Sequence, residues 1–305
     1  MADPASPSPP QQNRLLGILL RLGATTCFGF MAAMIKLGYE HGVSTVELVF
    51  YRFAFGLPPL LLWIAWTRNF TAWRTQRPLA HITRTAIGLT TMMLGFSALA
   101  FLPLAEATTI GFVAPLFAVL LSALVLREEV GRHRWSAVAV GFGGVLIVMQ
   151  PQGTDLPLAG LALALLSAFG VAAVTITIRQ IGRTEGTQTT VLWFTVLSML
   201  AVGMAMPFFA GFHDSRTWLI LFGLGTFGGV AQLLMTAALR CAPVSVVAPF
   251  DYAQLLWAVL LGWLIWNTQP AASTWLGAAV IIASGLYTLY REHRLGREKP
   301  RPEPL

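Results

Sequence analysis

The chain has 305 residues, of which 56% are hydrophobic and only 11% are charged. Soluble proteins carry about 25% charged residues, so this composition excludes an ordinary soluble domain and indicates a polytopic helical membrane protein. The net charge of +7 does not indicate nucleic-acid binding, because the basic residues form short clusters between apolar blocks. The two cysteines, Cys27 and Cys241, are too few for a disulfide framework.

Residues 1–13 are rich in Pro and Ser and predict a disordered tail. Ten apolar blocks of membrane-spanning length follow. Spans are predicted at 15–37, 45–66, 84–104, 107–126, 134–150, 158–179, 188–210, 217–239, 243–265 and 273–290. The strands of a membrane β-barrel would instead show alternation over about ten residues, which excludes that class.

The basic residues between the spans are distributed unequally over the two sides of the membrane. With a cytosolic N-terminus, one side receives Arg14, Arg68, Arg74, Arg77, Arg84, Arg127, Arg132, Arg134, Arg179, Arg183, Arg240 and the tail at 292–305. The opposite side receives only Lys36 and Arg216. Because basic loops stay on the cytosolic side, we expect ten spans with both termini in the cytosol.

The two halves of the chain resemble each other. An offset of 137 residues places Ala105 against Ala242 and Gly88 against Gly225. The halves, 14–150 and 151–291, each hold five predicted spans, and an odd number requires that one half be inverted relative to the other. Inverted repeats are typical of secondary transporters, with the substrate held near the membrane midplane at the repeat interface.

The stretches FMAAMIKLG, FYRFAFG and ALAFLPLAEATTIGFVAPLFAVLLSALVLREEVGRHRW are similar to the drug/metabolite transporter superfamily, EamA type. The resemblance covers nearly the whole chain outside the tails. It implies an all-α fold of ten transmembrane helices, two inverted five-helix EamA repeats around a central cavity, in an inner or plasma membrane. It further implies transport of amino acids, nucleotide-related metabolites, vitamins or drugs, without a cofactor or a metal.

Arg52 lies inside the second predicted span, where a charged side chain is costly unless protein groups receive it. Glu106, Asp251 and backbone carbonyls are the candidate partners. A structural pairing that fixes this helix and a charge on the wall of the substrate path both remain possible interpretations. In either case the side chain should face protein or cavity, away from lipid.

The segment PFDYAQ in the ninth predicted span supplies the strongest candidates for the substrate path, Asp251, Tyr252 and Gln254. Pro249 is expected to loosen the helix and expose backbone groups, which is tolerated where they line a cavity. The alternative is a packing hydrogen bond from Asp251 to Gln232, which is itself a candidate.

Lys36 and Glu106 complete the candidate substrate path, near its outer end. Lys36 is equally well explained by a side chain that reaches for the membrane interface, and Glu106 by an acid in the first turn of a helix. A gating pair between Glu106 and Lys36 or Arg52 is the functional alternative. Glu128 and Glu129 are interpreted as part of a surface charge cluster, with a cytosolic gate second.

These observations predict a secondary transporter that moves a zwitterionic or anionic metabolite by alternating access. An intramembrane enzyme using an Arg and acid constellation is the alternative, although all five histidines fall outside the spans and no HExxH or GxSxG is present. A channel and a receptor are disfavoured by the asymmetric charges and short loops. The expected partners are a small molecule, the lipid bilayer and, as a hypothesis, a proton on Asp251 or Glu106. The chain is expected to act as a monomer or homodimer.

Overall fold

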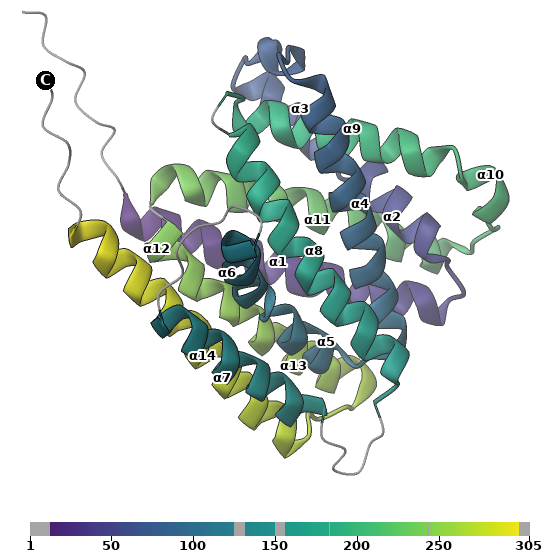
Figure 1. Ribbon diagram of the computed structural model, residues 1–305. Helices are drawn as coiled ribbons and strands as arrows, with labels where there is room; N and C mark the ends of the chain where they lie inside the picture. Colours follow the sequence, from purple (N-terminus) through teal and green to yellow (C-terminus); the bar gives the residue numbers. More distant parts are fainter. Residues whose placement is uncertain (1–12, 125–131, 150–155, 183, 243, 299–305) are drawn as a thin grey trace, which may run out of the picture.

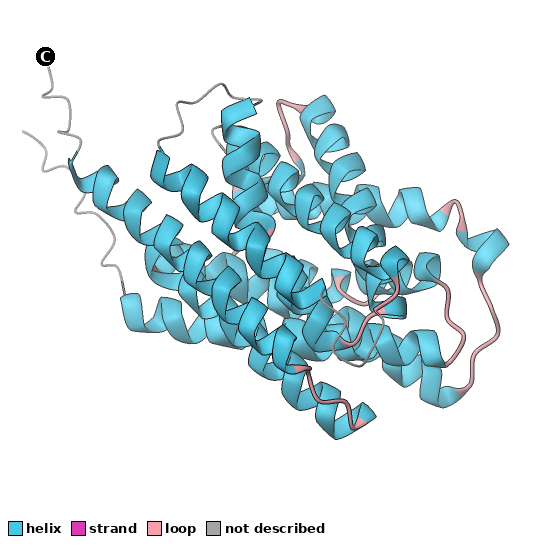
Figure 2. Ribbon diagram, turned by 60° about the horizontal axis from the view of Figure 1, so that its bottom comes forward, coloured by secondary structure: helices cyan, strands magenta, loops and turns pink. Residues whose placement is uncertain are grey.

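The computed structural model describes residues 13–124, 132–149, 156–182, 184–242 and 244–298. Over these residues the protein is helical, and they contain no strand (Figure 2). The first half contains α1 (Arg14–Glu40), α2 (Thr45–Ala54), α3 (Leu57–Trp66), η1 (Phe70–Trp73), α4 (Pro78–Phe101), α5 (Leu104–Gly111), α6 (Ala114–Leu124) and α7 (Arg132–Met149). The second half contains α8 (Leu158–Ile181), α9 (Thr187–Gly203), α10 (Met206–Phe209), α11 (Ser215–Cys241), α12 (Val244–Val247), η2 (Ala248–Tyr252), α13 (Ala253–Trp266) and α14 (Ala272–Glu298).

The described residues form ten apolar helical passes. Eight helical segments are long and apolar enough to cross a membrane, and the two shorter helices Trp135–Met149 and Thr187–Gly203 complete the set. The predicted all-α membrane fold is therefore confirmed. The largest differences from the predicted spans are that α4 begins at Pro78 and α14 continues to Glu298. The tail at 1–12 and the acidic pair Glu128 and Glu129 lie outside the described residues.

Four of the passes are interrupted where prolines follow a break in the helix, including the break between α9 and α10, which Pro207 follows. The second pass divides into α2 and α3 at Gly56, directly before Pro58 and Pro59. A proline cannot donate a backbone hydrogen bond, and it is tolerated in the first turn of a helix, so a new helix begins there. Pro115 follows the break between α5 and α6, and Pro249 lies in the 3-10 turn η2. The predicted loosening of the helix at Pro249 is confirmed.

Helices of the first half pack against helices of the second half. Helix α1 packs along α11, and α4 packs along α8 in the same way. Helices α13 and α1 are in contact, as are their counterparts α6 and α8, while α7 packs along α14 (Figure 1). Each pair joins one helix of the first half to one of the second, so the interior of the protein is shared between the repeats.

Glycines on α11 allow its backbone to contact the backbone at the break between α2 and α3. A Cβ atom added to Gly225 would lie 2.6 Å from the backbone oxygen of Tyr51, and one added to Gly229 would lie 2.8 Å from the oxygen of Gly56. Real Cβ atoms do not approach so closely, so small residues are required at this crossing. Close packing is therefore the role of Gly225 and Gly229.

Glu47 ties the start of α2 to the second half of the chain. Its carboxylate accepts a hydrogen bond from the backbone N–H of Ser44 at 3.0 Å and completes a capping box at the helix N-terminus. The other carboxylate oxygen accepts from the backbone N–H of Gly211 and contacts the ring Nε2 of His213, both at 2.8 Å. This buried acid therefore fixes the connection between α10 and α11 against α2.

Candidate functional site

A cavity of about 980 Å³ lies between the two halves. Its wall is built from α1, α4, α5, α6 and α8 together with η2, α13 and α14. Apolar and aromatic side chains such as Phe28, Met31 and Phe112 dominate it, and a few polar groups interrupt them. A large apolar cavity with few converging polar groups is the usual form of a small-molecule site.

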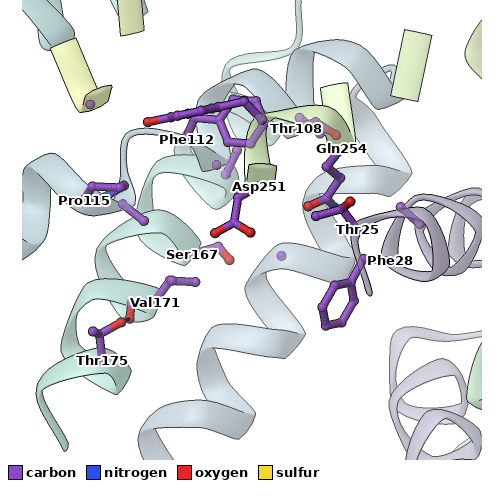
Figure 3. A pocket seen from close by; sticks show the side chains of 18 of the residues that line it. Thr25, Phe28, Thr108, Phe112, Pro115, Ser167, Val171, Thr175, Asp251 and Gln254 are labelled. Carbon is purple, nitrogen blue, oxygen red and sulfur yellow. Dashed lines mark hydrogen bonds between the residues drawn. The ribbon is translucent and has the colours of Figure 1, made fainter. Parts of the chain in front are cut away.

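The wall contributed by α5 and α6 follows one helical stripe. Thr108, Gly111, Pro115 and Ala118 all line the cavity, and they repeat at intervals of three or four residues. The break at Phe112 and Val113 separates α5 from α6 in the middle of this stripe. Figure 3 shows Thr108, Phe112 and Pro115 on one side of the space that Asp251 enters.

Asp251 projects from the 3-10 turn η2 into the cavity, where it lies between Ser167 and Thr25 (Figure 3). Both of its carboxylate oxygens accept hydrogen bonds from the guanidinium group of Arg21, through Nε and one terminal nitrogen. The side chain of Arg21 is 13% exposed and that of Asp251 is 37% exposed. This bidentate pair crosses from the first half to the second and leaves the cavity wall without net charge at that point.

Tyr252 and Gln254 also line the cavity, so the PFDYAQ segment contributes three side chains to it. The ring of Tyr252 meets Phe112 edge to face, with the ring centroids 4.9 Å apart. Its hydroxyl occupies the place of a side chain at Gly285, because a Cβ there would lie 2.1 Å from the hydroxyl oxygen. The side-chain amide of Gln254 has no hydrogen-bond partner among the described residues, which leaves it free for a ligand.

The hydroxyl groups of the wall are oriented by backbone carbonyls. Thr25 donates to the carbonyl of Leu22 at 2.9 Å, and Thr175 donates to that of Val171 at 2.8 Å. Ser167 on α8 donates to the carbonyl of Thr91 on α4 at 3.1 Å. Since each proton is already engaged, these oxygens present lone pairs to the cavity and can accept hydrogen bonds from a ligand.

The remaining predicted residues lie outside the wall of the large cavity. Lys36 donates to the backbone carbonyl of Leu102 at 3.0 Å, at the C-terminus of α4. Glu106 is buried and accepts a hydrogen bond from the hydroxyl of Thr274 on α14 at 3.1 Å. Neither residue forms an ion pair within the described part of the chain.

Arg52 is buried within the protein, as predicted, and neither of its two candidate acidic partners, Glu106 and Asp251, pairs with it. It lines a separate small cavity of about 10 Å³, together with Gln232. The alternative hydrogen bond between Asp251 and Gln232 is likewise not formed, because Asp251 is engaged by Arg21.

Two arginines lie at positions that the sequence does not predict. Arg21, which is not among the predicted site residues, lies within α1 on the wall of the large cavity. The sequence does contain a signal for Arg21, because an ionisable residue inside an apolar span is by default a candidate functional residue. Arg84, assigned to a cytosolic loop, is buried within α4. The cause is that α4 begins six residues before the predicted span.

Ten apolar helical passes around a shared central cavity define a polytopic membrane protein with a candidate small-molecule site. The chain matches the EamA-like transporter family over residues 15–150 and 158–290, and it belongs to that family. The family and its relatives are transporters, which disfavours the enzyme alternative.

Three relatives that resemble the chain over most of its length are named for small metabolites. A riboflavin transporter of Vibrio cholerae is 28% identical over 292 residues, 95% of this chain and 98% of the relative. A riboflavin transporter of Rhizobium johnstonii is 33% identical over 271 residues, 87% of this chain and 86% of the relative. An S-adenosylmethionine uptake transporter of Rickettsia prowazekii is 27% identical over 256 residues, 83% of this chain and 85% of the relative. The protein is therefore a multi-pass membrane transporter of small metabolites.

Proposed function

We propose that the protein transports a metabolite built from a flat heteroaromatic ring system and a polar tail, with riboflavin as the first candidate. The observation that carries this proposal is the composition of the large cavity. Phe28, Phe112 and Tyr252 offer aromatic surfaces, and the hydroxyls of Thr25 and Ser167 offer acceptors. Aromatic side chains stack on flat rings, whereas oriented hydroxyls suit the hydroxyl groups of a ribityl chain.

The charge at the cavity wall supports a neutral substrate of this kind. Arg21 and Asp251 neutralise each other, so a neutral ligand does not leave an unpaired ion behind. The cavity volume of about 980 Å³ reaches the upper end of the range for drug-sized ligands. Two relatives named riboflavin transporters support the same class.

A zwitterion with an aromatic group, such as S-adenosylmethionine, is the second candidate, and the Arg21–Asp251 pair is the observation that favours it. A guanidinium group binds a carboxylate in bidentate fashion, and a carboxylate binds an ammonium group. A substrate that carries both charges can bind Arg21 through its carboxylate and Asp251 through its ammonium group. Neither residue is then left unpaired. Arg21 and Asp251 would then be direct ligands.

We propose alternating access between the two repeats as the mechanism, with the termini in the cytosol and the protein in the inner membrane. The wall of the cavity includes Arg21, Thr175 and Thr288, and the first turn of α1 and the last turn of α14 lie at the same end of the bundle (Figure 1). The described conformation therefore extends its cavity toward the cytosolic side. Basic loops on that side support this orientation.

Contacts between the halves close the opposite end. The hydroxyl of Thr274 on α14 donates to Glu106 on α5, and the indole N–H of Trp266 on α13 donates to Glu40 on α1. Both contacts must separate if the repeats rock apart on that side. Glu106 is also the better candidate for a coupling proton, because Asp251 already has a cationic partner. A substrate transport rate that does not change with an imposed pH gradient would refute the proposed proton coupling.

Uptake by proteoliposomes tests the substrate class. Radiolabelled riboflavin should enter saturably, and Phe112→Leu should raise KM by about tenfold, because a base–aromatic stack contributes about 1–3 kcal/mol. The matched control is Phe117→Leu, since Phe117 packs against Phe142 and Phe169 and does not line the cavity. Uptake of S-adenosylmethionine that requires Arg21 and Asp251, without riboflavin uptake, would support the second candidate. Uptake of neither compound would overturn the substrate class.

A further inference from the structure

Unsatisfied polar atoms gather in one region of the protein, between α2, α4 and α9. Nine buried side-chain nitrogen and oxygen atoms of the described residues have no hydrogen-bond partner, and eight of them belong to this region. They come from Arg52, His81, Arg84, Thr85, Trp193 and Ser198. Buried polar groups are nearly always paired in proteins, so such a concentration indicates a ligand or ions that complete the site.

Two of these side chains carry permanent positive charge. Arg52 is 6% exposed and Arg84 is 7% exposed, and neither forms an ion pair with a described residue. The guanidinium of Arg52 lies 4.7 Å from the ring centroid of Phe53, and that of Arg84 lies 4.0 Å from the ring centroid of Phe194. The two rings meet edge to face at 5.3 Å, so both cations flank one aromatic pair.

Among the described residues, no carboxylate forms an ion pair with Arg52 or Arg84, and Glu185, the nearby acid, accepts hydrogen bonds from Thr75 and Gln76 instead. Arg52 lies in the last turn of α2, where the helix C-terminus supplies about half a negative charge at most. The aromatic faces attract cations but carry no net charge. Arginine does not lose its proton in proteins, and a buried charge without a counter-charge is strongly destabilising. The region therefore requires an anion.

The small cavity beside Arg52 determines the size of that anion. It is lined by Arg52, Thr195 and Gln232 together with apolar side chains, and no carboxylate lines it. The hydroxyl of Thr195 and the side-chain amide of Gln232 have no partner among the described residues, so both can donate hydrogen bonds into the cavity. A volume of about 10 Å³ accepts roughly one water-sized sphere and excludes a metabolite carboxylate or phosphate.

We propose that this cavity binds a single chloride ion, held by the guanidinium of Arg52, the hydroxyl of Thr195 and the amide of Gln232. Arg84 on the neighbouring helix α4 lies outside the wall of this cavity and adds positive potential to the region. The ion would join α2, α9 and α11, which belong to different halves of the chain. The site is separate from the large cavity, and the inference is independent of which substrate the transporter carries.

Thermal unfolding of the purified full chain in detergent tests the proposal. Chloride is varied at constant ionic strength, with gluconate as the replacing anion, because gluconate is too large for the cavity. The unfolding temperature of the wild type should rise with the logarithm of chloride concentration, as expected for a ligand that binds only the folded state. An unfolding temperature that does not respond to chloride would overturn the proposal and indicate a water molecule instead.

Thr195→Val removes one proposed donor while keeping the shape of the side chain. It should weaken chloride binding by about tenfold or more, because hydrogen bonds to charged groups contribute about 1.5–3 kcal/mol. The matched control is Thr190→Val on the same helix, whose hydroxyl donates to the carbonyl of Gly186 at 3.1 Å. Equal chloride dependence in the two variants would overturn the position of the site.

Direct binding keeps the proposal testable if a variant fails to fold. Equilibrium binding of ³⁶Cl⁻ to the wild-type protein should saturate at one ion per chain. Bromide should compete with it, since a halide of similar size fits the same donors. Absence of saturable ³⁶Cl⁻ binding would overturn the proposal without any variant.

Discussion

Replacing Asp251 with Asn should destabilise the protein because Arg21 then loses its counter-charge inside the cavity wall. Removing one partner of a fully buried ion pair costs about 3–5 kcal/mol. An exposed pair contributes about 1 kcal/mol or less. The side chains are 13% and 37% exposed, so we expect an intermediate cost of about 1–3 kcal/mol.

A double-mutant cycle measures this interaction. Asp251→Asn, Arg21→Gln and the double variant are compared by unfolding in detergent. The double variant should be more stable than the sum of the single effects predicts, because it contains no unpaired charge. Arg14→Gln, an exposed arginine on the same helix, is the control and should change little. Strictly additive effects of the two single substitutions would refute the reasoning.

Three further predictions concern packing, the cavity wall and pH. Gly225→Ala should lower stability by about 1–3 kcal/mol, because its Cβ would collide with the backbone of α2; Gly143→Ala, with open space at its Cβ, is the control and should not lower it. Gly285→Ala should displace the hydroxyl of Tyr252 and change KM for transport more than unfolding temperature, and the reverse pattern would contradict a cavity role for Tyr252. Burial raises the pKa of Glu185. Hydrogen bonds from the loop before α4 together lower this pKa by more than burial raises it, so the pKa lies below its ordinary value. Its stabilising contribution is therefore present above the unfolded pKa of about 4.3 and is lost as pH falls through the folded value. The wild type and Glu185→Gln should differ in unfolding temperature at neutral pH and converge in acid, whereas a constant difference would contradict this assignment.

Part of the cavity wall follows a pattern that is visible in the sequence. Thr108, Gly111, Pro115 and Ala118 repeat at helical spacing, and all four line the large cavity. Asp251 also lines this cavity, and a proline two residues earlier and a carboxyl group in an apolar span are the local signals that mark it. Such signals depend on a few neighbouring residues, which is why they can be read along the chain.

The sequence does not predict which buried charged side chains pair with each other. Arg52 and Asp251 are both conspicuous in apolar spans, yet Asp251 pairs with Arg21 and Arg52 lies beside a different cavity. Arg84 shows the same limit, since a residue near the end of a predicted span can be in a loop or in the helix. These distinctions depend on helices that are far apart in the chain.

The amino-acid sequence by itself determines that this chain crosses a membrane as ten apolar helical passes, because length, hydropathy and the absence of charge are properties of each segment alone. It also indicates the internal repeat, since similarity between halves needs no structure. Only the tertiary structure decides which polar groups share a cavity. Most lipid-facing, packed and cavity-lining positions are apolar or small, so they are distinguished only when α1, α5, α6, α8 and η2 meet around one space.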